Sequence, residues 1–150
     1  MVKVYRSAVI HVPAGRIWKL LRDFNGLPRW HPLIDRSEIE GGLQADQVGC
    51  VRRFTLREDG SMLREQLLAL SDPERTLTYN ILESPMPVAH YVATLRVTPV
   101  TVGDVSFVEW WAEFEVTAGP AQDTVRHIGD DVFVVGFGAL GEVLGAPHRR

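Results

Sequence analysis

The sequence lacks the residue patterns that usually mark a metal site or a nucleophilic enzyme. Its one cysteine, Cys50, cannot form an internal disulfide, and there is no Cys-x-x-Cys pair. Its five histidines form neither a His-Glu-x-x-His motif nor another closely spaced ligand set. There is also no Gly-x-Ser-x-Gly elbow and no glycine-rich phosphate loop. We therefore expect no metal and no cofactor, and we disfavour serine hydrolases and nucleotide-dependent enzymes.

An excess of basic charge and a long hydrophobic run are absent as well. The formal net charge is -3, whereas a protein that binds nucleic acid normally presents a basic face. The longest nearly apolar stretch, residues 132–141, is far shorter than the roughly 18 residues that a membrane-spanning helix needs. No signal-peptide core follows the basic residues near the amino terminus. We expect a soluble cytoplasmic protein with no nucleic-acid partner and no membrane span, in which residues 1–150 form a single domain.

The hydrophobic pattern predicts one strand, a helical region and then six further strands. Residues 2–12 are rich in β-branched side chains and lead through Pro13 into a helix that ends at Asn25-Gly26. The prolines around Trp30 and His31 predict a second, short helix or turn. Six strands separated by turn residues follow at residues 35–40, 48–57, 62–70, 76–83, 91–98 and 105–116. Turns this short join antiparallel neighbours, so we expect an antiparallel meander.

Residues 121–144 predict a long terminal helix whose apolar side chains cover more than one face. One apolar stripe consists of Val125, Ile128, Val132, Val135 and Ala139. A second apolar surface consists of Phe133, Val134, Phe137 and Leu140. A helix that is apolar nearly all round is covered by something. Two alternatives remain open at this point, a lid over the protein's own interior and a homodimer contact.

Asp59-Gly60 is the strongest local signal in the sequence. A two-residue loop of this type supplies the positive φ angles of a tight hairpin, and it fixes the register of the strands on either side. In that register Phe54 faces Glu65 and Arg52 faces Leu67, all on one face of the sheet. This face is apolar except for Arg52 and Glu65, which lie diagonally across the two strands and within reach of each other.

The Arg52 and Glu65 pair has two interpretations. In the first, the pair binds the carboxylate, phenol or carbonyl of a ligand, and Glu65 is the best candidate for a catalytic general base. In the second, the two side chains form a purely structural buried ion pair. Placing both charges in a dry core costs several kcal/mol each before their attraction offsets it, so a wet cavity accommodates them more easily.

Alternation in the later strands turns further aromatic side chains toward the same interior. Tyr79, Tyr91, Trp110 and Phe114 are among the inward-facing residues. A buried tyrosine hydroxyl or indole N–H normally needs a hydrogen-bond partner, which a ligand or a trapped water can supply. The same alternation places His90 on the outer face.

Several short stretches occur in a characteristic order along the chain. They are VPA at residues 12–14 with IW at 17–18, LPRWHP at 27–32, LTY at 77–79 and VAHY at 88–91. Together with the order of the expected elements, they resemble the START/Bet v 1-like (SRPBCC) superfamily in its polyketide cyclase/dehydrase-type branch. The resemblance implies an α+β helix-grip fold. Such a fold has a curved seven-stranded antiparallel β-sheet around a long C-terminal α-helix, two short helices after the first strand, and a cavity between sheet and helix.

The resemblance also implies that the loop around Trp30 and His31 borders the mouth of the cavity. These two residues then form a gate, or else Trp30 covers the edge of the core while His31 lies in solvent. Adding the inward-facing residues of the strands and of the terminal helix gives the full set of ligand-binding candidates. They are Trp30, His31, Arg52, Phe54, Glu65, Leu67, Tyr79, Tyr91, Trp110, Phe114, Ile128 and Val132.

Fold resemblance does not imply one chemistry, since members of this superfamily include lipid and hormone carriers, cyclases, hydrolytic enzymes and activators of chaperones. The first hypothesis is binding of a small hydrophobic or aromatic, lipid- or polyketide-like molecule in the cavity, oriented by Arg52 and Glu65. The second is a cyclase/dehydratase-type enzyme in which Glu65 or a tyrosine moves protons. The third is activation of a chaperone ATPase through the protein surface, which would make the cavity incidental.

Overall fold

The computed structural model of the chain describes residues 1–145. Its elements in chain order are β1 (Val2–Ile10), α1 (Ala14–Leu21), η1 (Leu27–Arg29), β2 (Ile34–Ile39), η2 (Glu40–Gly42), β3 (Val51–Leu56), β4 (Met62–Ser71), β5 (Thr76–Glu83), β6 (Val88–Val100), β7 (Val105–Val116), α2 (Ala121–Arg126), η3 (His127–Val134) and α3 (Val135–Leu144). In this part of the chain, seven strands form one antiparallel sheet of order β1-β7-β6-β5-β4-β3-β2. The expected meander is confirmed, with β1 added at the edge beside β7.

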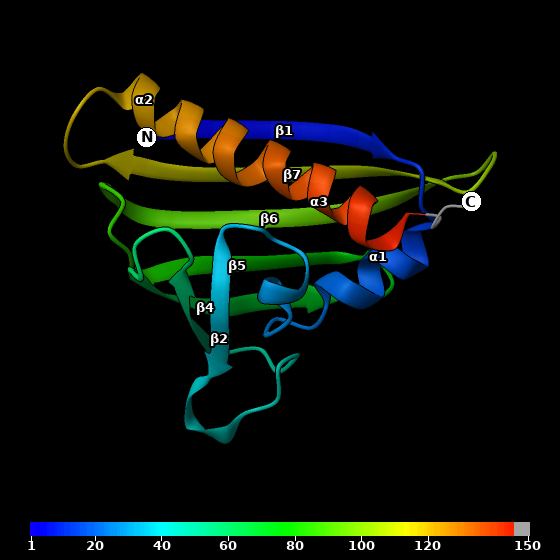
Figure 1. The fold of residues 1–150 in the computed structure, drawn as a ribbon, viewed down its shortest axis with the longest axis horizontal. Helices are drawn as coiled ribbons and strands as arrows, with labels where there is room; N and C mark the ends of the chain where they lie inside the picture. Colours follow the sequence, from blue (N-terminus) through cyan, green and yellow to red (C-terminus); the bar gives the residue numbers. More distant parts are fainter. Residues whose placement is uncertain (146–150) are drawn as a thin grey trace.

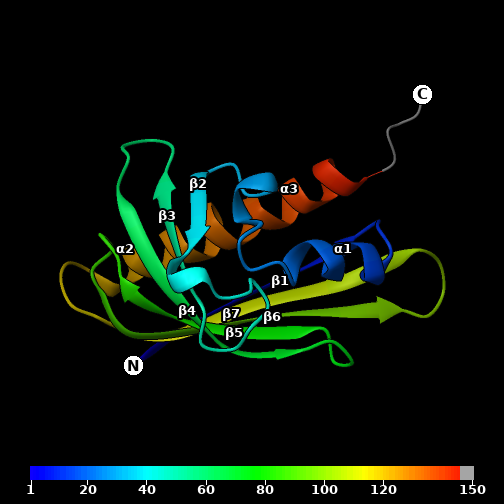
Figure 2. The ribbon, with the colours of Figure 1, turned by 90° about the horizontal axis from the view of Figure 1, so that it is seen from below.

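The sheet grips the continuous terminal helix formed by α2, η3 and α3. Figure 1 shows this helix lying lengthwise across one face of the sheet, next to β1. In Figure 2 the sheet curves so strongly that β2 and β3, at one end of the strand order, lie alongside the terminal helix. Two short helices, α1 and the 3-10 helix η1, follow β1. The predicted α+β helix-grip fold is therefore confirmed.

Strand boundaries differ from the expected ones by a few residues, for local reasons. The strands β5 and β7 have the expected bounds, whereas β3 begins at Val51 because Gly49 just before it takes a φ of +98°. The strand β6 is longer than expected because its pairing with β7 extends from Val88 to Val100. Neither difference changes which side chains face the helix.

The hairpin between β3 and β4 departs from the predicted two-residue turn. Its loop spans residues 57–60, closed by a hydrogen bond from the Leu56 N–H to the Ser61 carbonyl at 2.8 Å. The Asp59 carboxylate accepts a hydrogen bond from the Ser61 N–H at 2.9 Å, a local bond that favours this longer turn. The predicted register was wrong by two residues, and Arg52 lies directly opposite Glu65 rather than diagonal to it. A shift of two residues preserves the faces of the strands, so both side chains still point inward.

The terminal helix buries part of the predicted stripe, including Ile128, together with most of the second apolar surface. Its middle segment η3 is π-helical, which inserts an extra residue into the turn and rotates everything that follows. As a result Phe133, Phe137 and Leu140 are buried against the sheet, while Val135 of the predicted stripe is 40% exposed. The Phe133 ring stacks on Trp110 with 4.3 Å between ring centroids. Within residues 1–145, no helix is long and apolar enough to cross a membrane.

Candidate functional site

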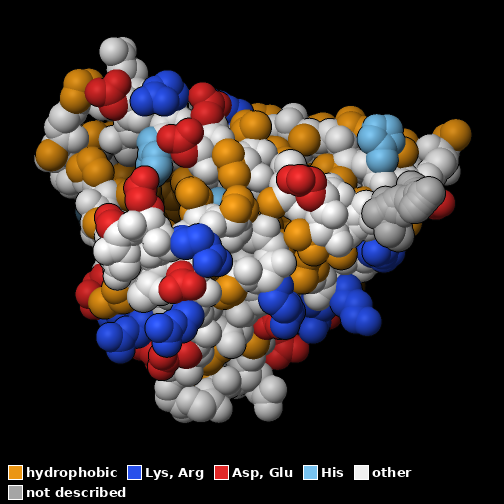
Figure 3. All heavy atoms as spheres, in the orientation of Figure 1, with side chains coloured by type: hydrophobic (Ala, Val, Ile, Leu, Met, Phe, Trp, Pro, Cys, Tyr) orange, Lys and Arg blue, Asp and Glu red, His pale blue; other side chains and the backbone are white. Residues whose placement is uncertain are grey.

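A cavity of about 370 Å³ lies between the concave face of the sheet and the terminal helix. Its exposed rim consists of Glu58, Pro85, His127, Asp131 and Val135. Figure 3 shows hydrophobic side chains around a hollow on the face that carries the terminal helix, with acidic and histidine side chains close by. The rim is thus polar on one side, and the walls behind it are mainly apolar.

A row of polar side chains closes the inner end of the cavity. Arg52, Glu65, Tyr79 and Tyr91 come from the four neighbouring strands β3 to β6, and all four line the cavity. The next inward residues along the same strands do not line it, and they are buried in solid core. These core residues are Cys50, Leu67, Leu77 and Ala93. The sheet is therefore divided into a filled half and a hollow half, with the polar row at the boundary.

The Arg52 guanidinium is held by two hydrogen bonds to one oxygen of Glu65. Its Nε and Nη2 donate to Oε1 of Glu65 at 2.9 and 2.6 Å, and its Nη1 donates to the Phe24 carbonyl at 3.1 Å. The guanidinium also lies 3.9 Å above the centre of the Phe24 ring. Among the hydrogen bonds of residues 1–145, none reaches Oε2 of Glu65. That oxygen stays available to a guest in the cavity.

Burial raises the pKa of three side chains in this polar row. Desolvation raises the pKa of Glu65 above its usual range, against the opposing effect of the Arg52 charge and its hydrogen bonds. Desolvation also raises the pKa of Tyr79 and that of Tyr91, so both phenols remain neutral. Trp110 donates its indole N–H to the Tyr79 oxygen at 3.1 Å. The Tyr79 hydroxyl proton is thereby directed to another acceptor.

A β-bulge in β6 turns Tyr91 into the interior. Pairing of β6 with β7 shifts between Ala89 and Val92, and His90 takes a left-handed φ of 56° that is unusual for a residue other than glycine. His90 itself is exposed, as alternation predicted, while the Tyr91 ring stacks on Phe114 at 5.3 Å. The strained bulge therefore positions one of the cavity's hydroxyl groups.

His31 connects the loop before β2 to the terminal helix. Its Nε2 lies 2.8 Å from the Val132 carbonyl, and its Nδ1 accepts a hydrogen bond from the Leu33 N–H at 3.3 Å. This arrangement places the ring proton on Nε2. Burial lowers the pKa of His31, and the nearby Arg52 charge lowers it further. The alternative in which His31 lies in solvent was wrong, because the residue is only 2% exposed.

Nine of the twelve candidate ligand-binding residues lie around the cavity. They are His31, Arg52, Phe54, Glu65, Tyr79, Tyr91, Trp110, Ile128 and Val132. The other three are buried elsewhere: Leu67 lies in the filled half of the sheet, Phe114 lies beneath Tyr91, and Trp30 packs near Trp110 at the edge of the core.

Several lining residues were not among the candidates. Leu56, Leu63 and Ile81 occupy inward positions that the strand alternation already indicates. His127 and Asp131 form an i, i+4 contact of 3.0 Å at the rim, and only the placement of the terminal helix could reveal them. In the described part of the chain, no three histidine, cysteine or acidic side chains converge as a metal site would require.

Comparison with known proteins agrees with this architecture. A family model described as polyketide cyclase / dehydrase and lipid transport matches residues 1–143. The chain belongs to this family. Members of the polyketide cyclase/dehydrase and lipid transport family bind small hydrophobic molecules, and the resemblance inferred from the sequence is confirmed.

Two solved bacterial structures are similar over almost the whole chain. The protein XoxI from Bacillus cereus is 28% identical, with a TM-score of 0.87 and complete coverage of both chains. A protein from Thermobifida fusca is 31% identical, with a TM-score of 0.85 and coverage of 97% of this chain and 94% of that one. Among curated proteins, the abscisic acid receptor PYL7 of Arabidopsis thaliana is 27% identical over 92 residues. That match covers 60% of this chain and 42% of the receptor, so the chain matches less than half of the receptor's length.

Proposed function

We propose that the chain acts as one domain that binds a small hydrophobic or aromatic, lipid- or polyketide-like molecule carrying one hydrogen-bonding group. The observation that carries this proposal is the row of Arg52, Glu65, Tyr79 and Tyr91 at the inner end of an otherwise mainly apolar cavity of about 370 Å³. Protein interiors are normally filled to the density of organic crystals. An apolar hollow of about 300–1,000 Å³ with a few convergent polar groups is typical of small-molecule sites.

The polar row determines how such a guest is oriented. Its hydrogen-bonding group meets the two tyrosine hydroxyls and Oε2 of Glu65, and its apolar body lies along Phe54 and Ile128. Arg52 and Glu65 compensate each other's charge at 2.6 Å. A neutral phenol or carbonyl therefore suits this end of the cavity better than a further charge, which would be buried without a partner of its own.

Native mass spectrometry of gently purified protein tests the proposal directly, because a retained small molecule would reveal the class of guest. Calorimetric titration of ligand-free protein with para-butylphenol then measures affinity. The substitution Tyr79→Phe removes one hydroxyl, and we expect affinity to fall about 2–10-fold. A matched control is Tyr5→Phe, which also removes a phenolic hydroxyl, but on the outer face of the sheet.

We expect the control to bind like the wild type. The proposal fails if no molecule is retained and neither para-butylphenol nor a panel of apolar dyes changes the tryptophan fluorescence. It also fails if Tyr79→Phe and Tyr5→Phe have the same effect on affinity.

A cyclase/dehydratase-type reaction is a second candidate function, favoured by the raised pKa of Glu65. A buried carboxylate with a raised pKa is better suited to general base catalysis than one at its usual value. The substitution Glu65→Gln separates the two functions, with Glu83→Gln on the exposed end of β5 as a charge-matched control. A binding protein with this variant keeps most of its affinity for para-butylphenol. An enzyme loses turnover of a polyketide-like substrate while its binding remains largely intact.

A further inference from the structure

The two ends of the cavity differ in charge. At the inner end, the charges of Arg52 and Glu65 are paired at 2.6 Å. At the rim, the charged side chains are the exposed carboxylates of Glu58 and Asp131, with the histidines counted as neutral. Figure 3 shows acidic side chains close to the hollow on this face of the molecule. The rim is therefore acidic, whereas the inner end is compensated.

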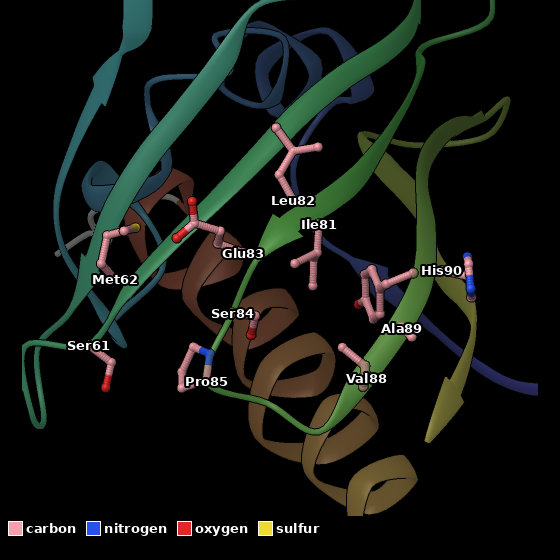
Figure 4. A pocket seen from close by; sticks show the side chains of 11 residues that line it. Ser61, Met62, Ile81, Leu82, Glu83, Ser84, Pro85, Val88, Ala89 and His90 are labelled. Atoms are coloured by element: carbon pink, nitrogen blue, oxygen red, sulfur yellow. The ribbon is translucent and has the colours of Figure 1, made fainter. Parts of the chain in front are cut away.

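The two rim carboxylates lack an arginine or lysine partner. Among the hydrogen bonds and ion pairs within residues 1–145, none involves the Glu58 side chain, and Asp131 contacts His127 alone, at 3.0 Å. By contrast, Glu83 in the neighbouring groove between β5 and β6, shown in Figure 4, accepts a hydrogen bond from Arg64 at 3.0 Å. Uncompensated charges of one sign at the edge of an apolar cavity concentrate the electric field there, because the walls have a low dielectric constant. The rim thus attracts a cationic group.

The backbone at the rim and the buried carboxylate at the inner end both point to a ligand. Four residues of the π-helical segment η3 line the cavity, namely His127, Ile128, Asp131 and Val132. Segments of this kind are rare and occur frequently at functional sites. Independently, Glu65 is only 5% exposed, and its Oε2 has no partner among the hydrogen bonds of the described residues. One guest can therefore meet an unpaired carboxylate oxygen at each end of the cavity.

We propose that the guest carries a protonated amine at the end remote from its phenol-like or carbonyl group, and that Glu58 and Asp131 bind this amine at the rim. The inference rests on the proposed function and names its ligand class, an arylalkylamine. A guest with a carboxylate at that end is disfavoured, because its charge would lie beside two others of the same sign. A metal ion is disfavoured as well, because no site of three histidine, cysteine or acidic side chains forms within residues 1–145.

Three phenols of similar shape test this assignment. They are para-(aminoethyl)phenol, para-propylphenol and para-hydroxyphenylpropanoate, which end in an ammonium, a methyl and a carboxylate group respectively. Their affinities are measured by calorimetric titration of ligand-free protein near neutral pH. The neutral phenol reports on the cavity itself, and the two charged phenols report on the rim.

The substitutions Glu58→Gln and Asp131→Asn each remove one rim charge while keeping the shape of the side chain. The matched control is Asp130→Asn, which removes the same charge from the next residue on the same helix. Asp130 is exposed, contacts Arg6 at 3.3 Å and does not line the cavity. All three positions are exposed, so these substitutions leave the fold intact.

We expect the wild type to bind para-(aminoethyl)phenol at least about tenfold more tightly than para-hydroxyphenylpropanoate, since each exposed charge pair changes an affinity by about two- to fivefold. Glu58→Gln and Asp131→Asn should each lower the affinity for the amine by about two- to fivefold and leave that for para-propylphenol unchanged. Asp130→Asn should change neither affinity. Salt at about 1 M should remove most of the amine's advantage, because it screens exposed charges.

Two results would overturn the inference alone. The first is that the amine binds the wild type no more tightly than the carboxylate does. The second is that neither rim substitution lowers the affinity for the amine more than Asp130→Asn does. In both cases para-propylphenol still binds, so the proposed function stands. If none of the three phenols binds the wild type, the inference and the proposed function are both wrong.

Discussion

Replacing Arg52 by methionine should destabilise the protein strongly and in a pH-dependent way. Methionine keeps much of the apolar stem but removes the guanidinium from a Glu65 side chain that is only 7% exposed. Removing one partner of a buried ion pair costs about 3–5 kcal/mol, because the remaining charge is left uncompensated. The Phe24 carbonyl also loses the hydrogen bond from Nη1. For a chain of this size the melting temperature should fall by roughly 2–4 °C per kcal/mol.

The pH dependence follows from the direction of the Glu65 pKa shift. The pKa is raised in the folded protein, so the contribution of Glu65 is fully present below its unfolded pKa and is lost as pH rises through the folded pKa. Arg52 opposes this rise, and its removal moves the folded pKa further upward. The destabilisation caused by Arg52→Met should therefore be smallest at acidic pH, where Glu65 is protonated, and should grow as pH rises through the folded pKa of Glu65.

Urea unfolding followed by tryptophan fluorescence at several pH values provides the measurement. The control is the double variant Arg52→Met with Glu65→Leu, which removes both charges and should lie within about 1–2 kcal/mol of the wild type or exceed it in stability. A loss below about 1 kcal/mol for the single variant, as for a solvent-exposed pair, would refute the reasoning. So would a loss that does not change with pH.

Three further predictions concern the backbone and His31. Gly136→Ala should cost about 1–3 kcal/mol of unfolding free energy, because the added Cβ would lie 2.9 Å from the Trp110 ring. The Cβ of Gly138→Ala meets nothing within 4 Å, so this variant should stabilise the helix by up to about 1 kcal/mol. Denaturant unfolding of both variants measures the difference. His90→Gly should stabilise the protein by about 0.5–1 kcal/mol because glycine adopts the positive φ of the bulge without strain, and a lower melting temperature would contradict this. The pKa of His31 is lowered by burial, so its contribution to stability is present above the unfolded pKa and is lost as pH falls through the folded pKa. His31→Gln should remove that acid sensitivity, as measured by melting temperature against pH.

Much of the fold could be predicted from local patterns. Strand alternation, short turns and the helical periodicity of the terminal segment are properties of neighbouring residues, and they were sufficient for the meander and the terminal helix. The helix-grip arrangement of these elements was implied by the family resemblance. Alternation also placed Arg52 and Glu65 on the inner face, and it did so despite a wrong register. An error of two residues leaves the side-chain faces unchanged.

Prediction was wrong where a long-range contact or a local distortion overrides the regular pattern. Periodicity assumes 3.6 residues per turn, so it could not reveal the π-helical segment η3, and it wrongly indicated that Val135 is buried. The turn after β3 was misassigned because the Asp59 side chain stabilises a longer loop. The burial of His31 depends on the Val132 carbonyl, about a hundred residues away in the chain.

The sequence by itself determined the order of the elements, the inward set of side chains and the presence of an acid and a base among them, because these depend on local periodicity. Only the tertiary structure decided where the interior is filled and where it is hollow. That division depends on which side chains pack against each half of the curved sheet, and these contacts join residues far apart in the chain. It makes the Arg52 and Glu65 pair the inner end of a cavity rather than part of a solid core.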